Sequence, residues 1–160
     1  MYSVLDISRF VLNYCDDKDY NWSTLILQYI LYFIQAYFLC NDKLLKPCFE
    51  EQIEAWDFGP VVPVAYHEYK RFGNTNIPRV ASYIEYDESN FWNSKVVSFN
   101  DGVIAAADKE IICQLVDKFA KYSTTSLVNI THRQTPWKDA YAQGRGSIIT
   151  NEAIRNYFNG

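Results

Sequence analysis

The sequence has few of the residues on which metal and disulfide chemistry depend. It contains two histidines, His67 and His132, and four cysteines, none of which are spaced as CxxC. This pattern fits neither a zinc site nor the disulfide framework of a small secreted protein. No metal ion and no cofactor is therefore predicted. Buried free thiols are the expected state of the cysteines, which are Cys15, Cys40, Cys48 and Cys113.

Excess positive charge is also missing. There are 15 Lys and Arg against 19 Asp and Glu, which gives a formal net charge of −4. Such a chain has no general attraction for nucleic acid, whereas a basic protein partner is easier to accommodate. The N-terminus lacks the basic region of a signal peptide. We therefore expect a cytoplasmic protein that does not bind nucleic acid.

One uncharged segment, Asn21 to Asn41, raises the question of a membrane span. Its apolar part, Leu25 to Cys40, has 16 residues. As a helix it would be about 24 Å long, which is shorter than the roughly 30 Å hydrocarbon core of a bilayer. Polar side chains also recur on one face of this helix, at Thr24, Gln28, Tyr32 and Gln35. We predict a central core helix with one polar stripe and no membrane association.

The length of 160 residues and the hydrophobic share of 49% indicate one domain with a sizeable core. Apolar periodicity, capping residues and Pro/Gly positions predict helices over residues 4–14, 24–40, 63–72, 108–121, 124–131, 136–142 and 151–158. Thr135 is the expected N-cap of the helix that begins at Pro136. The expected fold is a compact, multi-helix single domain over residues 1–160. It is mainly α and is assigned to the all-α class, with a small β-hairpin excursion around residues 79–100.

The hairpin prediction depends on two β-prone segments, Val80–Tyr86 and Lys95–Phe99, with a turn expected at 87–90. Phe91 and Trp92 lie between the two segments. An aromatic pair exposed on a loop is typical of a binding hot spot. Burial of the pair under the hairpin is the alternative.

No group of residues forms a persuasive catalytic set. His132 beside a cysteine would suit thiol catalysis, but the cysteines lie in apolar contexts, which raise the pKa of a thiol. The alternative role of His132 is structural, with a hydrogen bond to a helix end that fixes the turn into Pro136. The segment Gly144–Ser147 lacks the lysine and the spacing of a phosphate-binding loop. We predict no catalytic residue and expect that the protein is not an enzyme.

Two short blocks are the most distinctive features of the chain. The first is Glu54-Ala55-Trp56-Asp57-Phe58-Gly59-Pro60-Val61-Val62-Pro63, and the second is Thr131-His132-Arg133-Gln134-Thr135-Pro136-Trp137. A tryptophan, a glycine and two prolines within the first block restrict its backbone tightly. Trp56 and Trp137 are expected to lock the two proline-containing turns into the core.

The two blocks, in this order, resemble the Panacea domain family, also described as antitoxin SocA-like or phage-associated GepA-like. The resemblance extends over nearly the whole chain and is weakest from about Arg79 to Ala105. The family helix that reads like LKLQKLLYxxQ corresponds to Leu25–Gln35. The motif positions, which the resemblance marks as structural, are Gln28, Trp56, Gly59, Pro60, Thr131, His132, Pro136 and Trp137.

The resemblance implies an antitoxin of a type II toxin–antitoxin system, which neutralises a toxin encoded by an adjacent gene through direct protein binding. The alternative that it implies is a proteolytic adaptor that works with a host protease, or a phage or prophage interaction protein without a toxin. Some relatives carry an extra DNA-binding domain, for which this chain is too short. The sequence does not determine the oligomeric state.

This chain has Ile26 and Tyr29 where the family helix commonly has lysines. The two residues are expected to present an apolar surface that suits a different partner. The residues predicted to contact a partner are therefore Ile26, Tyr29, Phe91 and Trp92.

Overall fold

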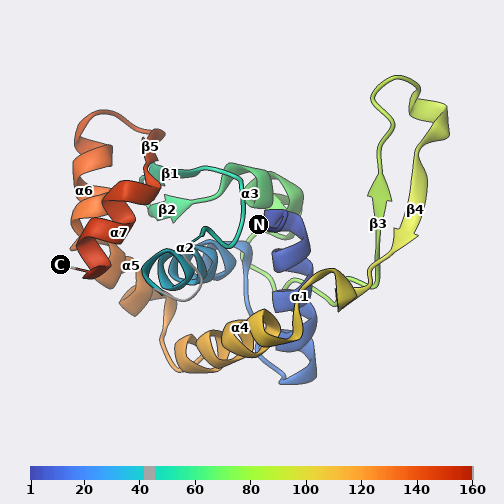
Figure 1. Cartoon of the computed structure of the whole chain (residues 1–160), viewed down its shortest axis with the longest axis horizontal. Coiled ribbons are helices and arrows are strands. Elements are labelled where there is room, and N and C mark those ends of the chain that lie inside the picture. The colour runs from blue at the N-terminus through green and yellow to red at the C-terminus, as the bar shows by residue number, and fades with distance from the viewer. Residues whose placement is uncertain (42–45, 160) are drawn as a thin grey trace.

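The uncharged segment forms helix α2 (Thr24–Cys40), which lies at the centre of the molecule (Figure 1). The computed structural model describes residues 1–41 and 46–159. Of the 17 residues of α2, 13 are buried. The helices that contact it are α1 (Val4–Asp17), α3 (Pro63–Tyr69), α4 (Ala106–Phe119), α5 (Thr124–His132) and α7 (Asn151–Asn159). The predicted core helix is confirmed, and no helix in the described residues is long and apolar enough to cross a membrane.

The polar stripe of α2 faces inward and holds backbone segments that cross the helix. Gln28 accepts a hydrogen bond from the backbone N–H of Val62 at 3.0 Å. Gln35 accepts from the N–H of Cys48 at 2.7 Å and donates to the carbonyl of Phe49 at 3.0 Å. Because buried backbone groups need hydrogen-bond partners, these two glutamines determine which backbone segments can pack against an otherwise apolar helix.

The remaining helices form where the pattern predicts them, with small shifts at their ends. Ser3 caps α1 by accepting from the N–H of Leu5 at 3.2 Å, and Thr150 caps α7 by accepting from the N–H of Ala153 at 3.1 Å. The predicted third helix divides into α3 and a 3₁₀ turn, η1 (Lys70–Phe72). Helix α6 (Thr135–Ala142) has Gln134 at its N-cap, so Thr135 is the first helical residue and not the cap.

The sequence pattern does not predict a three-stranded antiparallel sheet, and the all-α assignment is corrected to mainly α with strands. The order of the sheet is β2-β1-β5, with β1 (Ile53–Trp56) in the centre, β2 (Gly59–Val61) on one side and β5 (Ser147–Ile149) on the other. Each of these strands has only three or four residues. Such runs are too short to show a period of two, so the pattern indicates only connecting segments there.

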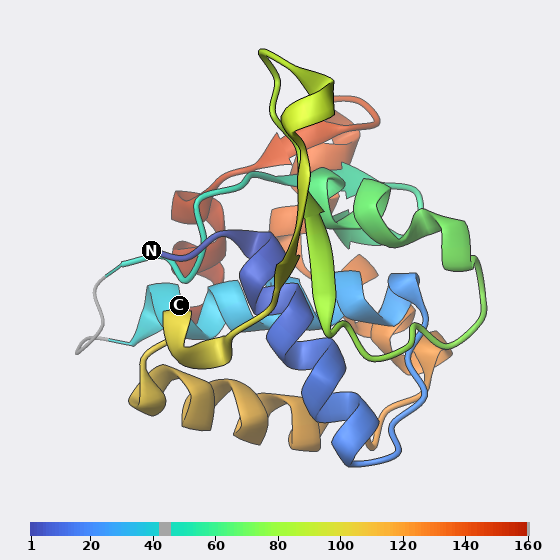
Figure 2. The ribbon, with the colours of Figure 1, turned by 90° about the vertical axis from the view of Figure 1, so that its right-hand side faces the viewer.

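The predicted hairpin is confirmed. Strands β3 (Ser82–Glu85) and β4 (Lys95–Ser98) pair in antiparallel fashion, and a 3₁₀ turn, η2 (Phe91–Asn93), lies between them. We call residues 82–98 the arm. Figures 1 and 2 show that the arm projects from the helical body, while a further 3₁₀ turn, η3 (Asp101–Val103), leads from its base into α4.

Candidate protein-binding surfaces

The end of the arm carries an exposed aromatic cluster. Trp92 is 89% exposed and Phe91 is 66% exposed, so the alternative of burial under the hairpin is wrong. The ring of Phe91 lies edge-to-face with that of Trp92, at 5.9 Å between centroids, and is stacked at 6.4 Å on that of Tyr86. Phe91 thus contacts both of the other rings, and all three residues are mostly exposed to solvent.

Hydrogen bonds within the arm hold this cluster in place. The carboxylate of Asp87 accepts from the hydroxyl of Ser89 at 2.6 Å and from the N–H groups of Ser89 and Asn90 at 2.9 and 3.2 Å. The Ser89 hydroxyl and these N–H groups lower the pKa of Asp87. The side chain of Asn90 in turn accepts from the N–H of Trp92 at 3.1 Å. An ordered loop presents its aromatic rings at a lower entropic cost than a flexible one.

One face of the arm carries an exposed apolar pair. Ile84 and Val96 are cross-strand partners on this face and are 52% and 73% exposed. Cross-strand β-branched pairs usually stabilise a sheet by covering one another against a core. Here the pair faces solvent. Sequence reasoning missed it, although the alternation of Tyr83, Ile84, Glu85 and Tyr86 is the signal that marks two different faces.

The opposite face of the arm is anchored to α1 at its base. The guanidinium of Arg9 lies 3.5 Å from the ring centroid of Tyr83 and bonds Asp6 at 2.9 Å. The side chain of Asn13 donates to the carbonyl of Val80 at 2.9 Å and accepts from its N–H at 2.6 Å. These contacts fix the base of the arm to the body while its end extends into solvent.

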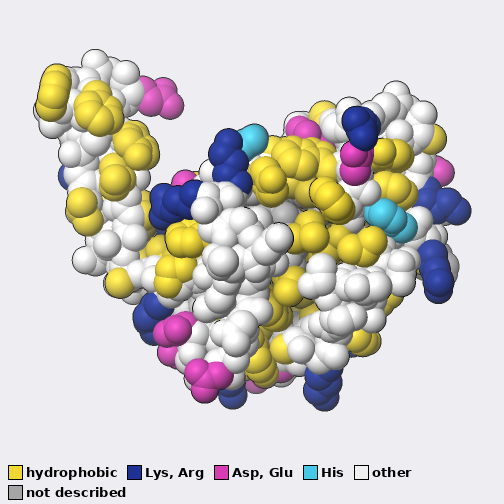
Figure 3. All heavy atoms as spheres, turned by 180° about the vertical axis from the view of Figure 1, so that it is seen from behind, with side chains coloured by type: hydrophobic (Ala, Val, Ile, Leu, Met, Phe, Trp, Pro, Cys, Tyr) yellow, Lys and Arg dark blue, Asp and Glu magenta, His cyan; other side chains and the backbone are white. Residues whose placement is uncertain are grey.

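A second surface is formed by the two sequence blocks, which meet in space. The indole N–H of Trp137 donates to the backbone carbonyl of Trp56 at 2.8 Å. The ring of Trp137 stacks on His132 at 4.1 Å and on Tyr141 at 4.6 Å. The ring of Trp56 packs edge-to-face on Tyr66 at 4.9 Å. Figure 3 shows this aromatic surface between the two histidines, and we call it the motif face.

The motif face qualifies one prediction and corrects another. Trp56, at the end of β1, and Trp137 are only partly buried, and Trp137 packs against the outside of the core. The predicted hydrogen bond of His132 to a helix end does not form, since its Nε2 has no partner in the described part of the chain and its ring is held by stacking on Trp137. The turn into Pro136 is instead held by Gln134, whose N–H bonds the carbonyl of Thr131 at 3.1 Å.

The other motif residues of the two blocks are buried, and two of the elements that carry them, β2 and α5, contact α2. Gly59 and Pro60 lie in β2, Thr131 lies in α5, and Pro136 lies in α6. The hydroxyl of Thr131 donates to the carbonyl of Leu127 at 2.9 Å.

An ion pair closes the edge of the motif face. Asp57 accepts from the hydroxyl of Tyr141 at 2.6 Å and from Nε of Arg145 at 2.7 Å. The tyrosine hydroxyl and the guanidinium hold the pKa of Asp57 below its usual value. Asp57 lies in the turn between β1 and β2, so the contact joins that turn to the segment before β5.

The prediction that Tyr29 presents a surface is wrong. Tyr29 is fully buried, and its hydroxyl donates to the backbone carbonyl of Phe58. Burial raises the pKa of this hydroxyl. Ile26 is partly buried and packs against the core. Of the four predicted contact residues, the structure places Phe91 and Trp92 together on the arm, and it places Ile26 and Tyr29 on α2, away from that cluster.

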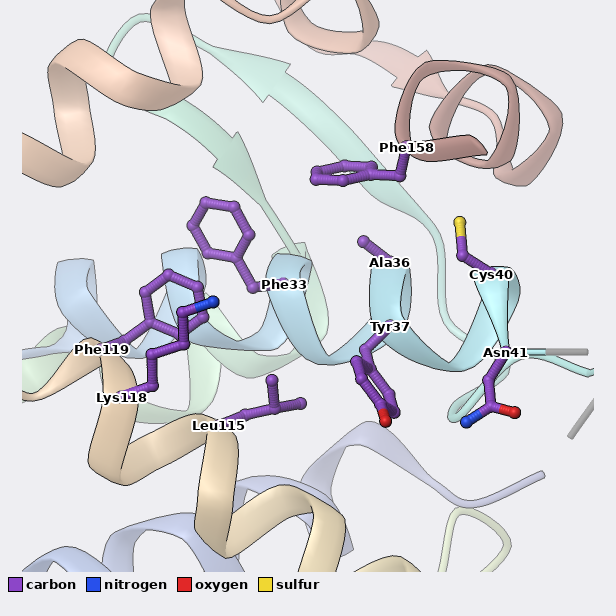
Figure 4. Close-up of a pocket in the computed structure, with 9 residues that line it drawn as sticks. All are labelled: Phe33, Ala36, Tyr37, Cys40, Asn41, Leu115, Lys118, Phe119 and Phe158. Atoms are coloured by element: carbon purple, nitrogen blue, oxygen red, sulfur yellow. The ribbon is translucent and has the colours of Figure 1, made fainter. Parts of the chain in front are cut away.

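An apolar groove of about 590 Å³ lies between α2, α4 and α7 (Figure 4). The rings of Phe33 and Phe119 stack at 4.4 Å, and Phe158 approaches Phe33 edge-on at 6.4 Å. Lys118 lies at its rim, 5.7 Å from the ring centroid of Phe119. The sequence indicates that these rings are apolar positions of three helices, but it cannot show that the helices leave a space between them.

Three of the four cysteines have thiols whose pKa is raised by burial. Burial raises the pKa of Cys15 to about 12 and also raises that of Cys48. Cys113 is partly buried, and its pKa is raised for the same reason. Across residues 1–41 and 46–159, no three His, Cys, Asp or Glu side chains are grouped as metal ligands.

Comparison with known proteins gives one finding. No curated protein and no solved structure matches the chain. The model of the family described as antitoxin SocA-like, Panacea domain, matches residues 27–138, which include most of α2, both sequence blocks and the arm. Since this match covers more than half of the sequence, the chain belongs to the family of SocA-like antitoxins with a Panacea domain.

Proposed function

We propose that this protein is the antitoxin of a type II toxin–antitoxin system and that it neutralises a co-encoded protein toxin by direct binding in the cytoplasm. It would act without catalysis, through occlusion of the toxin in a stable complex. A stable complex of this kind buries on the order of 1,200–2,000 Å². Membership of an antitoxin family supports a protein partner.

The observation that carries the proposal is the ordered aromatic cluster at the end of the arm. Tryptophan is enriched among the few residues that dominate binding energy at protein interfaces. Trp92 and Phe91 contribute almost nothing to the core, because both are mostly exposed. Large apolar rings that are held in place and left in water are typical of an interaction site.

The test is growth of cells that express the adjacent open reading frame, with and without this chain, followed by copurification. Rescue with copurification supports neutralisation by binding. Rescue without a complex would instead favour the adaptor function, in which the toxin is delivered to a protease. Absence of any toxicity would count against a cognate toxin and favour a phage or prophage interaction protein.

The contact itself is tested by Trp92→Ala. Its melting temperature should match that of the wild type, because the ring is exposed, while affinity for the toxin should fall by at least about 30-fold, or about 2 kcal/mol. The control is Tyr122→Ala, which removes a ring that is also exposed but lies between α4 and α5. Equal toxin affinity of the Trp92 and Tyr122 variants would place the interface elsewhere.

A further inference from the structure

A cleft of about 550 Å³ separates the arm from the helical body. Strand β3 forms one wall, and α3 with η1 forms the other. Figure 3 shows the hollow, with hydrophobic side chains along the arm and basic side chains on the body opposite. The residues of the arm that line it include Ile84, Tyr86 and Val96, and those of the body include His67, Glu68 and Arg71.

The open edge of β3 faces this cleft. Eight consecutive residues, Ile77 to Ile84, line it, and the last three of them belong to β3, whereas β4 contributes only Val96. Successive residues of a strand point to opposite faces. An unbroken run of lining residues therefore means that the cleft is bordered by the edge of the strand rather than by one of its faces. Figure 1 agrees, since β3 is the strand of the arm nearer the body.

The register of the hairpin identifies the backbone groups at this edge. The N–H of Phe99 donates to the carbonyl of Ala81 at 2.9 Å. Since hydrogen-bonded and non-hydrogen-bonded pairs alternate in an antiparallel ladder, the next hydrogen-bonded position of β3 is Tyr83. The N–H and C=O groups of Ser82 and Ile84 therefore point away from β4 and into the cleft. An edge of this kind is a template for another strand.

The opposite wall supplies positive charge. Arg71 lines this wall, and its neighbour Lys70 lies just outside the lining; neither makes an ion pair with a carboxylate in the described residues. Arg79, at the foot of the cleft, is engaged by two aspartates of α1. Glu68 is the carboxylate among the lining residues and His67 is the neighbouring imidazole. The chain as a whole has a charge of −4, so this basic corner is a local reversal.

We propose that the cleft captures an extended segment of the protein partner, which adds to β3 as a third strand of the arm. The segment would alternate apolar residues, which pack on Ile84 and Val96, with an acidic residue that faces Arg71. Backbone hydrogen bonds to Ser82 and Ile84 would give affinity, and the apolar and basic walls would give sequence preference. The inference depends on the proposed function only in taking the toxin as the source of this segment.

The experiment uses a phage-displayed library of random dodecapeptides, selected on the full-length wild-type protein. Selected peptides should alternate apolar residues with an acidic one. Ser82→Pro removes an N–H that points into the cleft and places the proline ring there, and peptide affinity should fall by about tenfold or more. Ser98→Pro is the matched control, because Ser98 is the cross-strand partner of Ser82 and its N–H points to the opposite edge. The Ser98→Pro variant should bind the selected peptides with the same affinity as the wild type.

Arg71→Glu provides a second variant that leaves the hairpin ladder intact. Selection on this variant should replace the acidic residue of the peptides with a basic one. The proposal is overturned if no peptide is selected, if the two proline variants bind equally well, or if the charge preference is unchanged. It is also overturned if sedimentation shows a wild-type dimer that Ser82→Pro dissociates, because a second copy would then occupy the edge. Peptide binding without growth rescue would refute the antitoxin function and leave the cleft assignment standing.

Discussion

Gly59 is the position at which the structure predicts the largest effect of a single methyl group. It follows the turn that joins β1 to β2 and has a φ of +136°, which L-residues with a side chain rarely adopt. A Cβ atom at this position would lie 2.7 Å from Cε1 of Tyr29 and 3.1 Å from Oγ1 of Thr131. Both neighbours are fully buried. Gly59→Ala should therefore strain the backbone and overpack the contact of β2 with α2 and α5.

The magnitude follows from these two costs. A residue held in an unfavourable backbone region costs about 1–3 kcal/mol, and one extra methyl group in a packed core costs about 1–3 kcal/mol. The sum is about 2–6 kcal/mol of unfolding free energy. In a domain of this size each kcal/mol lowers the melting temperature by about 2–4 °C, so we expect a fall of about 4–24 °C.

Thermal denaturation followed by circular dichroism measures this effect, and Gly73→Ala is the matched control. Gly73 also has a positive φ, of +56°, but no atom of the described residues lies within 4 Å of the place that a methyl group would take there. With a ψ of −128°, Gly73 lies in a backbone region that residues with a side chain rarely adopt, so its substitution should cost only backbone strain of about 1–3 kcal/mol. If Gly59→Ala melts as high as Gly73→Ala, the tight packing of the first block against Tyr29 and Thr131 is not what stabilises this part of the fold.

Three further predictions concern buried or paired polar groups. Asp57→Asn removes a carboxylate whose pKa is lowered by the tyrosine hydroxyl and the arginine guanidinium that contact it. Because the pKa of Asp57 is lower in the folded state than its unfolded value of about 3.9, the ionised carboxylate stabilises the fold at every pH above that value. This contribution is lost as the pH falls through the folded-state pKa. In urea denaturation the advantage of the wild type over this variant should therefore shrink below about pH 4, and parallel pH profiles would contradict the contact. Burial raises the pKa values of Cys15 and Cys48. Both thiols should therefore react with Ellman's reagent at neutral pH only after urea unfolds the chain. Rapid reaction of either thiol in the native state would show that it is accessible. Gln35→Leu leaves the buried N–H of Cys48 without its partner and should cost about 1–3 kcal/mol, while the same change at the exposed Gln52 should leave the urea midpoint unchanged.

The helices could be predicted from the sequence because their signals are local. The span of α2 agrees with the structure at both ends, since its apolar run is bounded by Ser23 and by Asn41. The hairpin could be predicted because two β-prone segments flank a turn. The small sheet could not, because β5 reaches β1 from far along the chain and pairs through only three residues. That pairing depends on tertiary contacts and leaves no periodic signal.

The sequence could predict the residues of the candidate site on the arm but not the environment of those on α2. Phe91 and Trp92 could be singled out as an aromatic pair in an irregular loop, but the choice between exposure and burial under the hairpin required the structure, in which both are mostly exposed. The environment of Tyr29 depends on the turn at Phe58, which lies 29 residues away in sequence. A helical position next to a buried glutamine faces either solvent or a neighbouring segment, and only the tertiary fold decides between them.

The contacts that hold the two blocks together are independent of the arm. The bond from Trp137 to Trp56 joins the blocks across 81 residues, and the contact of Asp57 with Arg145 ties the first block to the segment before β5 across 88. Neither includes a residue of the arm. At the end of the arm, the ring of Phe91 contacts those of Tyr86 and Trp92, and Asn90 of the same loop holds the backbone of Trp92. Because exposed residues of this kind contribute little to folding, their substitution changes the partner surface at almost no cost to the framework. We therefore expect the preference for a partner to follow the arm, and the stability of the domain to follow the two blocks.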